Sequence, residues 1–151
     1  MLNTTQKVVT LNPDMTSAAV QGIPQFMGIS GKSAGSTGIA MNITAFGPGG
    51  KAKVHYHSGF ETAIYGLVGT TVLYWGEQLE NMCRIDPGVF CFIPPDTPHI
   101  AFNLSDTEPA YAVSCRNDPV EQENVVLVPE LDGLRDADAA AYKAQEANKQ
   151  K

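Results

Sequence analysis

The chain's three histidines, together with one nearby glutamate, are the residues whose spacing best suits a chemical role. His55 and His57 are separated by one residue, and Glu61 follows shortly after them. On a strand, residues i and i+2 point to the same face, so we expect both imidazoles to enter one space. A turn at Ser58 and Gly59 would bring Glu61 beside them across a hairpin. Two neutral nitrogen donors and one anionic oxygen suit a first-row divalent cation.

The third histidine, His99, follows a proline-rich segment, residues 94–98. These prolines would fix the approach of the next strand, so that His99 completes the site from across a barrel. The pattern therefore predicts one metal ion held by His55, His57, Glu61 and His99. The alternative is a solvated sheet face without an ion, because paired histidines with a nearby glutamate also occur there by chance.

The elements that would position these residues are predominantly strands. Short runs rich in Val, Ile, Thr, Tyr and Phe are separated by turns such as 47–50 and 86–88, where Pro and Gly occur together. With almost no helical periodicity between them, such runs favour an all-β sandwich or closed barrel. The candidate strands are 6–11, 38–46, 52–57, 60–68, 71–75, 82–86, 89–93, 100–104, 110–115 and 125–128.

Two segments differ in composition from these strands. Residues 1–36 are expected to form an N-terminal arm packed on the barrel, irregular over 12–36 apart from one strand near 25–29. Residues 37–130 would form the barrel, and 131–151 a C-terminal helical tail. Its helix, 136–150, is rich in Ala, Lys, Gln and Glu without a wide apolar stripe, which predicts a solvated helix.

Composition excludes several classes of function. The length of 151 residues suits one domain, and the net charge of -6 argues against a nucleic-acid surface. No window approaches the roughly 18 to 20 apolar residues of a membrane span, and the polar N-terminus does not read as a signal peptide. Three scattered cysteines make no disulfide framework, so we expect a cytoplasmic protein. Cys91 and Cys115 would act as small hydrophobes, and the pattern assigns Cys83 no role.

The segment around the first two histidines resembles the first signature of the cupin superfamily. That signature reads Gly, five residues, His-x-His, three or four residues, Glu, six residues, Gly. The chain has Gly49, His55, His57 and Glu61 at this spacing, and Gly69 one position beyond the usual place.

The segment around His99 is similar to the second cupin signature, which reads Gly, five residues, Pro-x-Gly, two residues, His, three residues, Asn. The chain has Gly88, Pro94, His99 and Asn103 at this spacing, with Asp96 in place of the glycine. Asp tolerates the left-handed turn conformation, so the departure is mild.

The resemblance implies a small single-domain metal-binding cupin, a double-stranded β-helix or jelly-roll barrel with a short C-terminal helix. In cupins the two histidines and glutamate of the first motif and the histidine of the second usually bind the metal. Four such ligands leave about two positions open on a six-coordinate ion. We expect manganese, with nickel, iron, cobalt or zinc as alternatives, because ligand type alone does not select among them.

Cupins with this ligand set include decarboxylases, dioxygenases and isomerases, so the resemblance implies an enzyme acting on a small oxygen-rich organic acid. The alternative is a non-catalytic protein that binds or senses a small molecule through its metal. Counting by twos along the strands points Tyr65 and Asn103 inward, and Arg116 closes a strand near the barrel mouth. These three are candidate substrate-binding residues. Core packing for Tyr65 and a solvated strand-end charge for Arg116 are the competing interpretations.

The strand 89–93 is apolar on both faces. One face should fill the barrel, while the other needs a cover, either the N-terminal arm or a second subunit. Cupins commonly pair through such a sheet, so the resemblance implies a homodimer.

Overall fold

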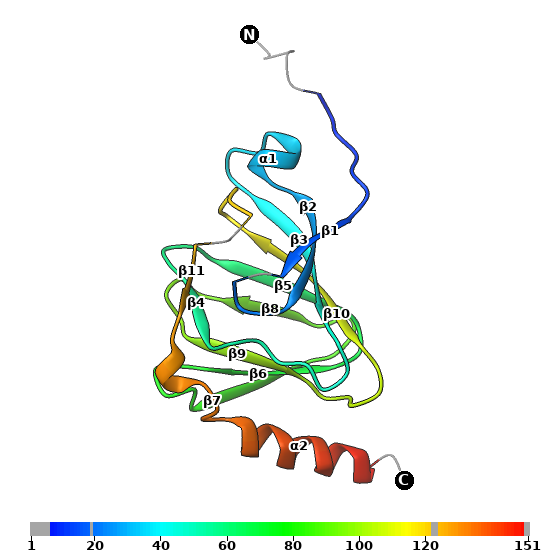
Figure 1. The fold of residues 1–151 in the computed structure, drawn as a ribbon, viewed down its shortest axis with the longest axis vertical. Coiled ribbons are helices and arrows are strands. Elements are labelled where there is room, and N and C mark those ends of the chain that lie inside the picture. The colour runs from blue at the N-terminus through cyan, green and yellow to red at the C-terminus, as the bar shows by residue number, and fades with distance from the viewer. Residues whose placement is uncertain (1–6, 19, 122–123, 150–151) are drawn as a thin grey trace.

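A computed structural model describes residues 7–18, 20–121 and 124–149, which fold into two facing antiparallel sheets (Figure 1). The first sheet has the order β1-β2-β3-β10-β5-β8 and the second β11-β4-β9-β6-β7. The first contains β1 (Asp14–Ala18), β2 (Pro24–Ile29), β3 (Ala40–Phe46), β5 (Thr62–Val68), β8 (Phe90–Ile93) and β10 (Ala110–Arg116). The second contains β4 (His55–His57), β6 (Thr71–Trp75), β7 (Asn81–Ile85), β9 (His99–Asn103) and β11 (Val125–Leu127). The described helices are α1 (Gly31–Ala34), the 3₁₀ turn η1 (Pro129–Leu131) and α2 (Asp136–Lys149).

The chain repeatedly crosses between the two sheets, so most neighbouring strands are distant in sequence. β10 pairs with both β3 and β5, while β9 pairs with both β4 and β6. This is the double-stranded β-helix of a jelly roll, and it confirms the all-β fold with a short C-terminal helix.

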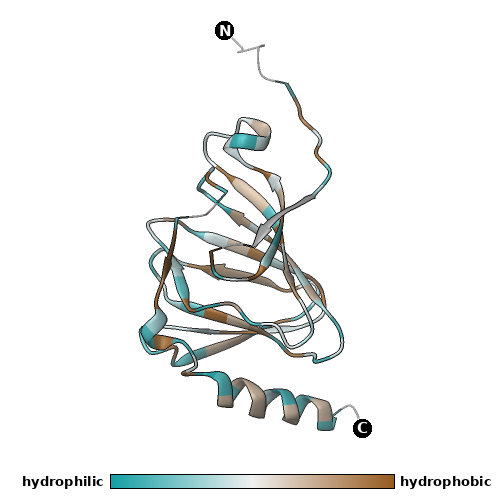
Figure 2. Cartoon of the chain, viewed as in Figure 1, coloured by the Kyte–Doolittle hydropathy of each residue, from teal (hydrophilic) through white to brown (hydrophobic). Residues whose placement is uncertain are grey.

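Alternation along the strands separates two of the three hydrophobic clusters found among the described residues. Leu73, Ile85 and Ile93 come from both sheets and pack together in the space between them. On β6 the next residue in each direction, Val72 or Tyr74, belongs to a different cluster, which Leu131 and Ala139 of the C-terminal segment complete. Figure 2 shows the hydrophobic colouring concentrated in the strands, whereas hydrophobic and hydrophilic residues alternate along α2.

The N-terminal segment is more structured than expected in one part and less in another. The strand near 25–29 is confirmed as β2, and it gains an unpredicted partner in β1. The predicted strand 6–11 is wrong over its described part, because residues 7–11 carry no strand. Val8, Val9 and Leu11 remain exposed in this extended stretch, so their apolar character is not used to pack against the sheets.

Several ion pairs link helix α2 to the barrel, in addition to the packing of Ala139. Lys51 Nζ lies 2.6 Å from a carboxylate oxygen of Asp136, and Lys143 Nζ lies 2.7 Å from Asp106. Arg84 of β7 pairs with Glu146. In the described part of α2, Ala139 is the buried residue, which matches a solvated helix; residue 150 lies outside the described residues. Among the described helices, none combines the length and apolar character needed to cross a membrane.

Candidate metal centre

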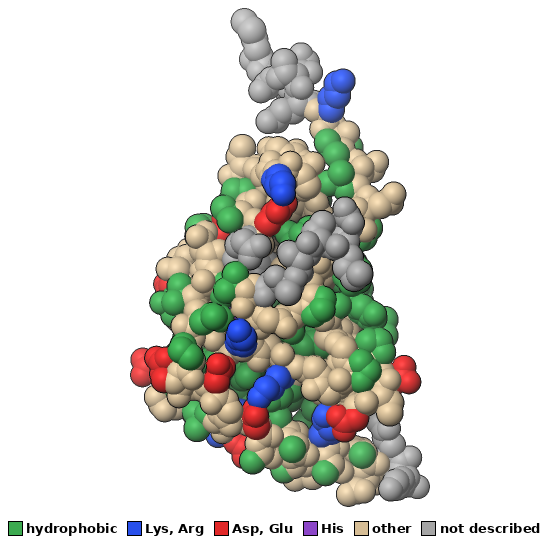
Figure 3. Space-filling view, viewed as in Figure 1, with side chains coloured by type: hydrophobic (Ala, Val, Ile, Leu, Met, Phe, Trp, Pro, Cys, Tyr) green, Lys and Arg blue, Asp and Glu red, His purple; other side chains and the backbone are tan. Residues whose placement is uncertain are grey.

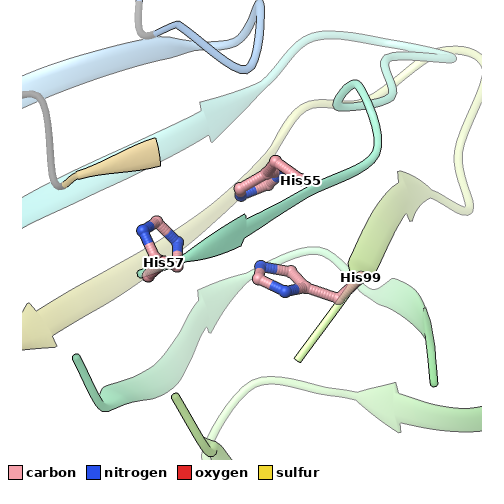
Figure 4. Close-up of side chains that lie close together, drawn as sticks. All are labelled: His55, His57 and His99. Carbon is pink, nitrogen blue, oxygen red and sulfur yellow. The ribbon is translucent and has the colours of Figure 1, made fainter. Parts of the chain in front are cut away.

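The three histidines lie together inside the barrel. His55 and His57 extend from the same face of β4, and His99 is the direct register partner of His55 on β9. The His55 and His99 ring centroids are 4.3 Å apart, and His57 lies 5.1 Å from the first and 5.5 Å from the second. Figure 4 shows the rings converging on one another. One nitrogen of each ring lies within 4.8 Å of the others, so small side-chain rotations would place them on one ion.

All three rings are buried, with exposed fractions of 2 to 5%. Accordingly, no histidine is visible on the face drawn in Figure 3, where hydrophobic and charged side chains are mixed. A solvated sheet face, the alternative interpretation of the histidine pattern, is therefore wrong for this cluster.

Backbone carbonyls orient two of the rings. His55 Nδ1 lies 2.8 Å from Lys53 O, and His99 Nδ1 lies 2.8 Å from Thr97 O. A carbonyl only accepts, so each Nδ1 carries the proton and donates it. The Nε2 lone pairs of both rings are consequently left for another partner, the arrangement found in metal-binding histidines.

Burial also keeps these rings neutral. It lowers the pKa of His99 to about 4, with Arg116 adding a smaller effect in the same direction. Burial, followed by the charge of His99, lowers the pKa of His55 well below its usual value. Both imidazoles are therefore unprotonated at neutral pH, the form that binds metals.

Arg116 is part of the cluster's surroundings. It ends β10, is 5% exposed, and places Nη2 3.2 Å from His57 Nε2. Because a guanidinium only donates, His57 Nε2 is the acceptor. A solvated strand-end charge, the competing interpretation of Arg116, is therefore wrong. The three imidazoles fit a divalent cation, provided that His57 exchanges this hydrogen bond for the ion.

A cavity of about 50 Å³ adjoins the cluster between the sheets. Its wall is polar near His55, His99 and Arg116 and otherwise largely apolar. The residues lining it are Gln21, Ile23, Thr44, Phe46, Ala52, His55, Ile64, Thr71, Leu73, Ile85, His99, Ala101, Ala112, Ser114 and Arg116.

The structure does not bring Glu61 to the histidines. Its side chain is exposed, and Asn117 Nδ2 lies 3.4 Å from its carboxylate at the surface. The reason is that β5 begins only at Thr62, which is buried and is the register partner of Arg116. The hydroxyl of Thr62 has no hydrogen-bond partner among the described residues.

The sequence held a signal for this shift. The first cupin signature allows four residues after the second histidine, which places Thr62, not Glu61, at the acidic position. Gly69 then falls at its usual spacing of six further residues. The one-residue displacement of Gly69 therefore indicated that Thr62, and not Glu61, occupies the buried position of the signature.

The other two candidate residues also lie outside the cavity. Tyr65 was expected to face inward, which is wrong: Ile64 lines the cavity, and the Tyr65 ring lies 4.6 Å from that of Phe90. Counting by twos failed because the alternation of β5 starts at Thr62. Asn103 is buried, but its Nδ2 donates to Gly47 O at 2.9 Å and to Glu108 O at 2.8 Å, so it braces loops.

The loops of the two signature segments are joined at Asp96. Its backbone N–H donates to His57 O at 3.1 Å, and its carboxylate accepts from the Gly59 N–H at 3.0 Å. Asp96 has a φ of 56°, which confirms the left-handed conformation expected where the signature has glycine. This contact holds the segment before His99 against the end of β4.

Residues 42–115 match the Cupin domain family. The chain belongs to the cupin superfamily. A search of curated protein sequences found no match.

Several solved structures share the fold. An oxalate oxidase in complex with the substrate analogue glycolate is 21% identical with a TM-score of 0.64, covering 82% of this chain and 63% of the other. A Lactobacillus farciminis oxalate decarboxylase formate complex is 21% identical with a TM-score of 0.62, covering 78% and 33%. An uncharacterized protein with a double-stranded β-helix domain from Klebsiella pneumoniae is 14% identical with a TM-score of 0.60, covering 76% and 90%. At these identities the likeness shows the fold alone.

Proposed function

We propose that this cupin binds one divalent metal ion through His55, His57 and His99 and acts with it on a small organic acid. The observation that carries the proposal is the buried cluster of three histidines. In two of them a backbone carbonyl binds Nδ1–H, so that the lone pair of Nε2 stays available for a metal ion. Manganese is the proposed ion, with nickel, iron, cobalt and zinc as alternatives. The metal would polarise an oxygen of the bound acid or exchange electrons with dioxygen.

Three features support a carboxylate as the ligand. Arg116 lines the cavity, and a guanidinium matches the planar geometry of a carboxylate. Thr62, the register partner of Arg116, has a buried hydroxyl without a hydrogen-bond partner among the described residues, and a polar ligand extending beyond the cavity lining to it would satisfy it. The structures with the same fold include proteins holding glycolate and formate. The reaction would be of the oxidase, dioxygenase, decarboxylase or isomerase type.

One observation favours the second candidate, a non-catalytic metal-dependent binding or sensing protein. No Asp or Glu is among the described residues that line the cavity. A carboxyl group that could transfer a proton beside the metal is thus missing from that lining. Binding without turnover would need only the histidines and Arg116.

The test begins with elemental analysis of untagged full-length protein, purified without added metal. The metal-loaded protein is then mixed with oxalate, glycolate and formate while O₂ uptake and CO₂ release are followed. Turnover that is lost in His57→Ala supports the enzyme. Metal at one equivalent with acid binding but no turnover supports the second candidate. Protein that fails to retain any of these ions after loading contradicts both.

We also propose that the protein is a cytoplasmic homodimer formed through the outer face of β8. Phe90 is 80% exposed and Phe92 60% exposed, and Tyr65 packs against the first of them on the same face. Burying such aromatic groups would favour association. Three free cysteines suit a reducing compartment. Sedimentation should give a dimer that Phe90→Lys dissociates; a monomer at micromolar concentration contradicts the proposal.

A further inference from the structure

Two cysteines meet where the edges of the sheets face each other. Cys83 lies on β7, the last strand of the second sheet, and Cys91 on β8, the last strand of the first. Both are half-buried free thiols, and both line one pocket with Trp75. Both also pack against the same interior cluster. Their side chains therefore point into the same space between the sheets, although the described pairings include no ladder between β7 and β8.

The two thiols also lie near enough to affect each other's ionisation. Interaction with the Cys91 thiol lowers the pKa of Cys83 to about 7, and interaction with Cys83 raises that of Cys91. A thiol of lowered pKa is the better nucleophile at neutral pH, and an adjacent thiol can resolve its oxidised form. Cys115 lies on β10 and outside this pocket, which makes it a matched control.

We propose that Cys83 and Cys91 form a reversible redox pair whose disulfide joins the two sheets at their open edge. Peroxide is the oxidant. The Cys83 sulfur attacks one peroxide oxygen, the O–O bond breaks, and the products are a Cys83 sulfenic acid and water. The Cys91 sulfur then attacks the Cys83 sulfur, which releases a second water and leaves the disulfide. Thiol exchange with a small dithiol returns both residues to the reduced form.

The position of this pair gives oxidation a structural consequence. Pro94 and Thr97 line the same pocket, and they belong to the segment that leads into His99. A covalent bond between the sheets would fix the wall of the pocket beside the Thr97 carbonyl that orients the His99 ring. Disulfides in cytosolic proteins are usually transient and serve catalysis or redox sensing. The proposal does not depend on the metal or the substrate.

The test uses reduced full-length protein treated with hydrogen peroxide after removal of the reductant. Titratable thiols should fall from three to one, because two of the chain's 3 cysteines are consumed. The intact mass should fall by about 2 Da, and peptide mapping should recover Cys83 joined to Cys91. Trp75, the single tryptophan, lines the same pocket, so its fluorescence should be quenched on oxidation and recover with dithiothreitol.

Matched variants separate the pair from general oxidation. Cys115→Ser should form the crosslink as the natural protein does, while Cys83→Ser and Cys91→Ser should not. In Cys91→Ser, a sulfenic acid trapped by dimedone should accumulate at Cys83. Three unchanged thiols after treatment that oxidises glutathione overturn the proposal, and so does a crosslink through Cys115. Should a variant fail to fold, peptide mapping of the oxidised natural protein is sufficient to decide whether Cys83 and Cys91 are joined.

Discussion

The second sheet supplies all three histidines of the candidate metal centre, whereas the facing strands of the first sheet supply Thr62 and Arg116. On the histidine side, β4 and β9 pair directly, and backbone carbonyls fix two of the rings. On the facing side, β5 begins at Thr62, one residue after Glu61, so the Glu61 side chain stays at the surface. The three histidines, which lie on the paired strands β4 and β9, were brought together as spacing predicted. Glu61, at a strand boundary, was not brought to them.

The largest expected effect separates these two sides directly. His99→Ala should weaken metal binding about 100-fold or more, since a metal ligand contributes roughly 3 kcal/mol. Glu61→Gln, the matched change on the other side, should leave metal affinity within about twofold, because its carboxylate bonds to Asn117 at the surface. Titration calorimetry with Mn²⁺ measures both. Equal losses of metal affinity in the two variants would mean that Glu61 is a metal ligand after all.

The next effect depends on the protonation of the histidine side. His55 and His99 have pKa values lowered by burial, so the unfolded state binds more protons as the pH falls. The free energy of unfolding of the metal-free protein should therefore be independent of these two groups above about pH 6.5. It should fall progressively between about pH 6.5 and pH 4, by up to about 3 kcal/mol for His99. Urea unfolding with a chelator at pH 7.5, 5.5 and 4.5 measures this loss. His99→Asn should flatten the slope, and an unchanged slope would contradict burial as the cause.

A smaller effect concerns the facing side. Arg116→Gln should weaken binding of a small carboxylate to the metal-loaded protein by about 10- to 30-fold, through loss of a charged hydrogen bond. It should also free His57 Nε2, so that metal affinity is kept or rises. Fluorescence titration with glycolate, beside calorimetry with the ion alone, separates the two quantities. A parallel fall in both would show Arg116 to be structural.

The smallest effect tests the buried hydroxyl. Thr62→Val keeps the shape of the side chain but removes an oxygen without a partner among the described residues. We expect the metal-free protein to gain about 1 kcal/mol of unfolding free energy. Chemical denaturation measures the gain, with Thr97→Val as the control that should show none, because the Thr97 hydroxyl donates to Pro95 O at 3.3 Å. A loss of stability in Thr62→Val would mean that the hydroxyl has a partner in solution.

Spacing predicted the fold and the histidines because both rest on short-range periodicity. His55 and His57 share a face by the two-residue repeat of a strand, and the glycine and proline turns delimit the strands. Glu61 and Tyr65 were misplaced because element boundaries are uncertain by a residue or more, and one residue reverses the face. The meeting of Cys83 and Cys91 in one pocket was beyond prediction from spacing, because the two residues come from strands of different sheets.

Because ion pairs help to attach α2 to the barrel, the attachment of this helix should depend on the salt concentration. Exposed pairs such as Lys51 with Asp136 and Lys143 with Asp106 weaken as dissolved ions accumulate around them. Concentrated electrolyte should therefore loosen the terminal helix while the jelly roll beneath it stays folded. The aromatic surface of Tyr74 and Phe102, which the C-terminal segment covers in part, would then become accessible to water.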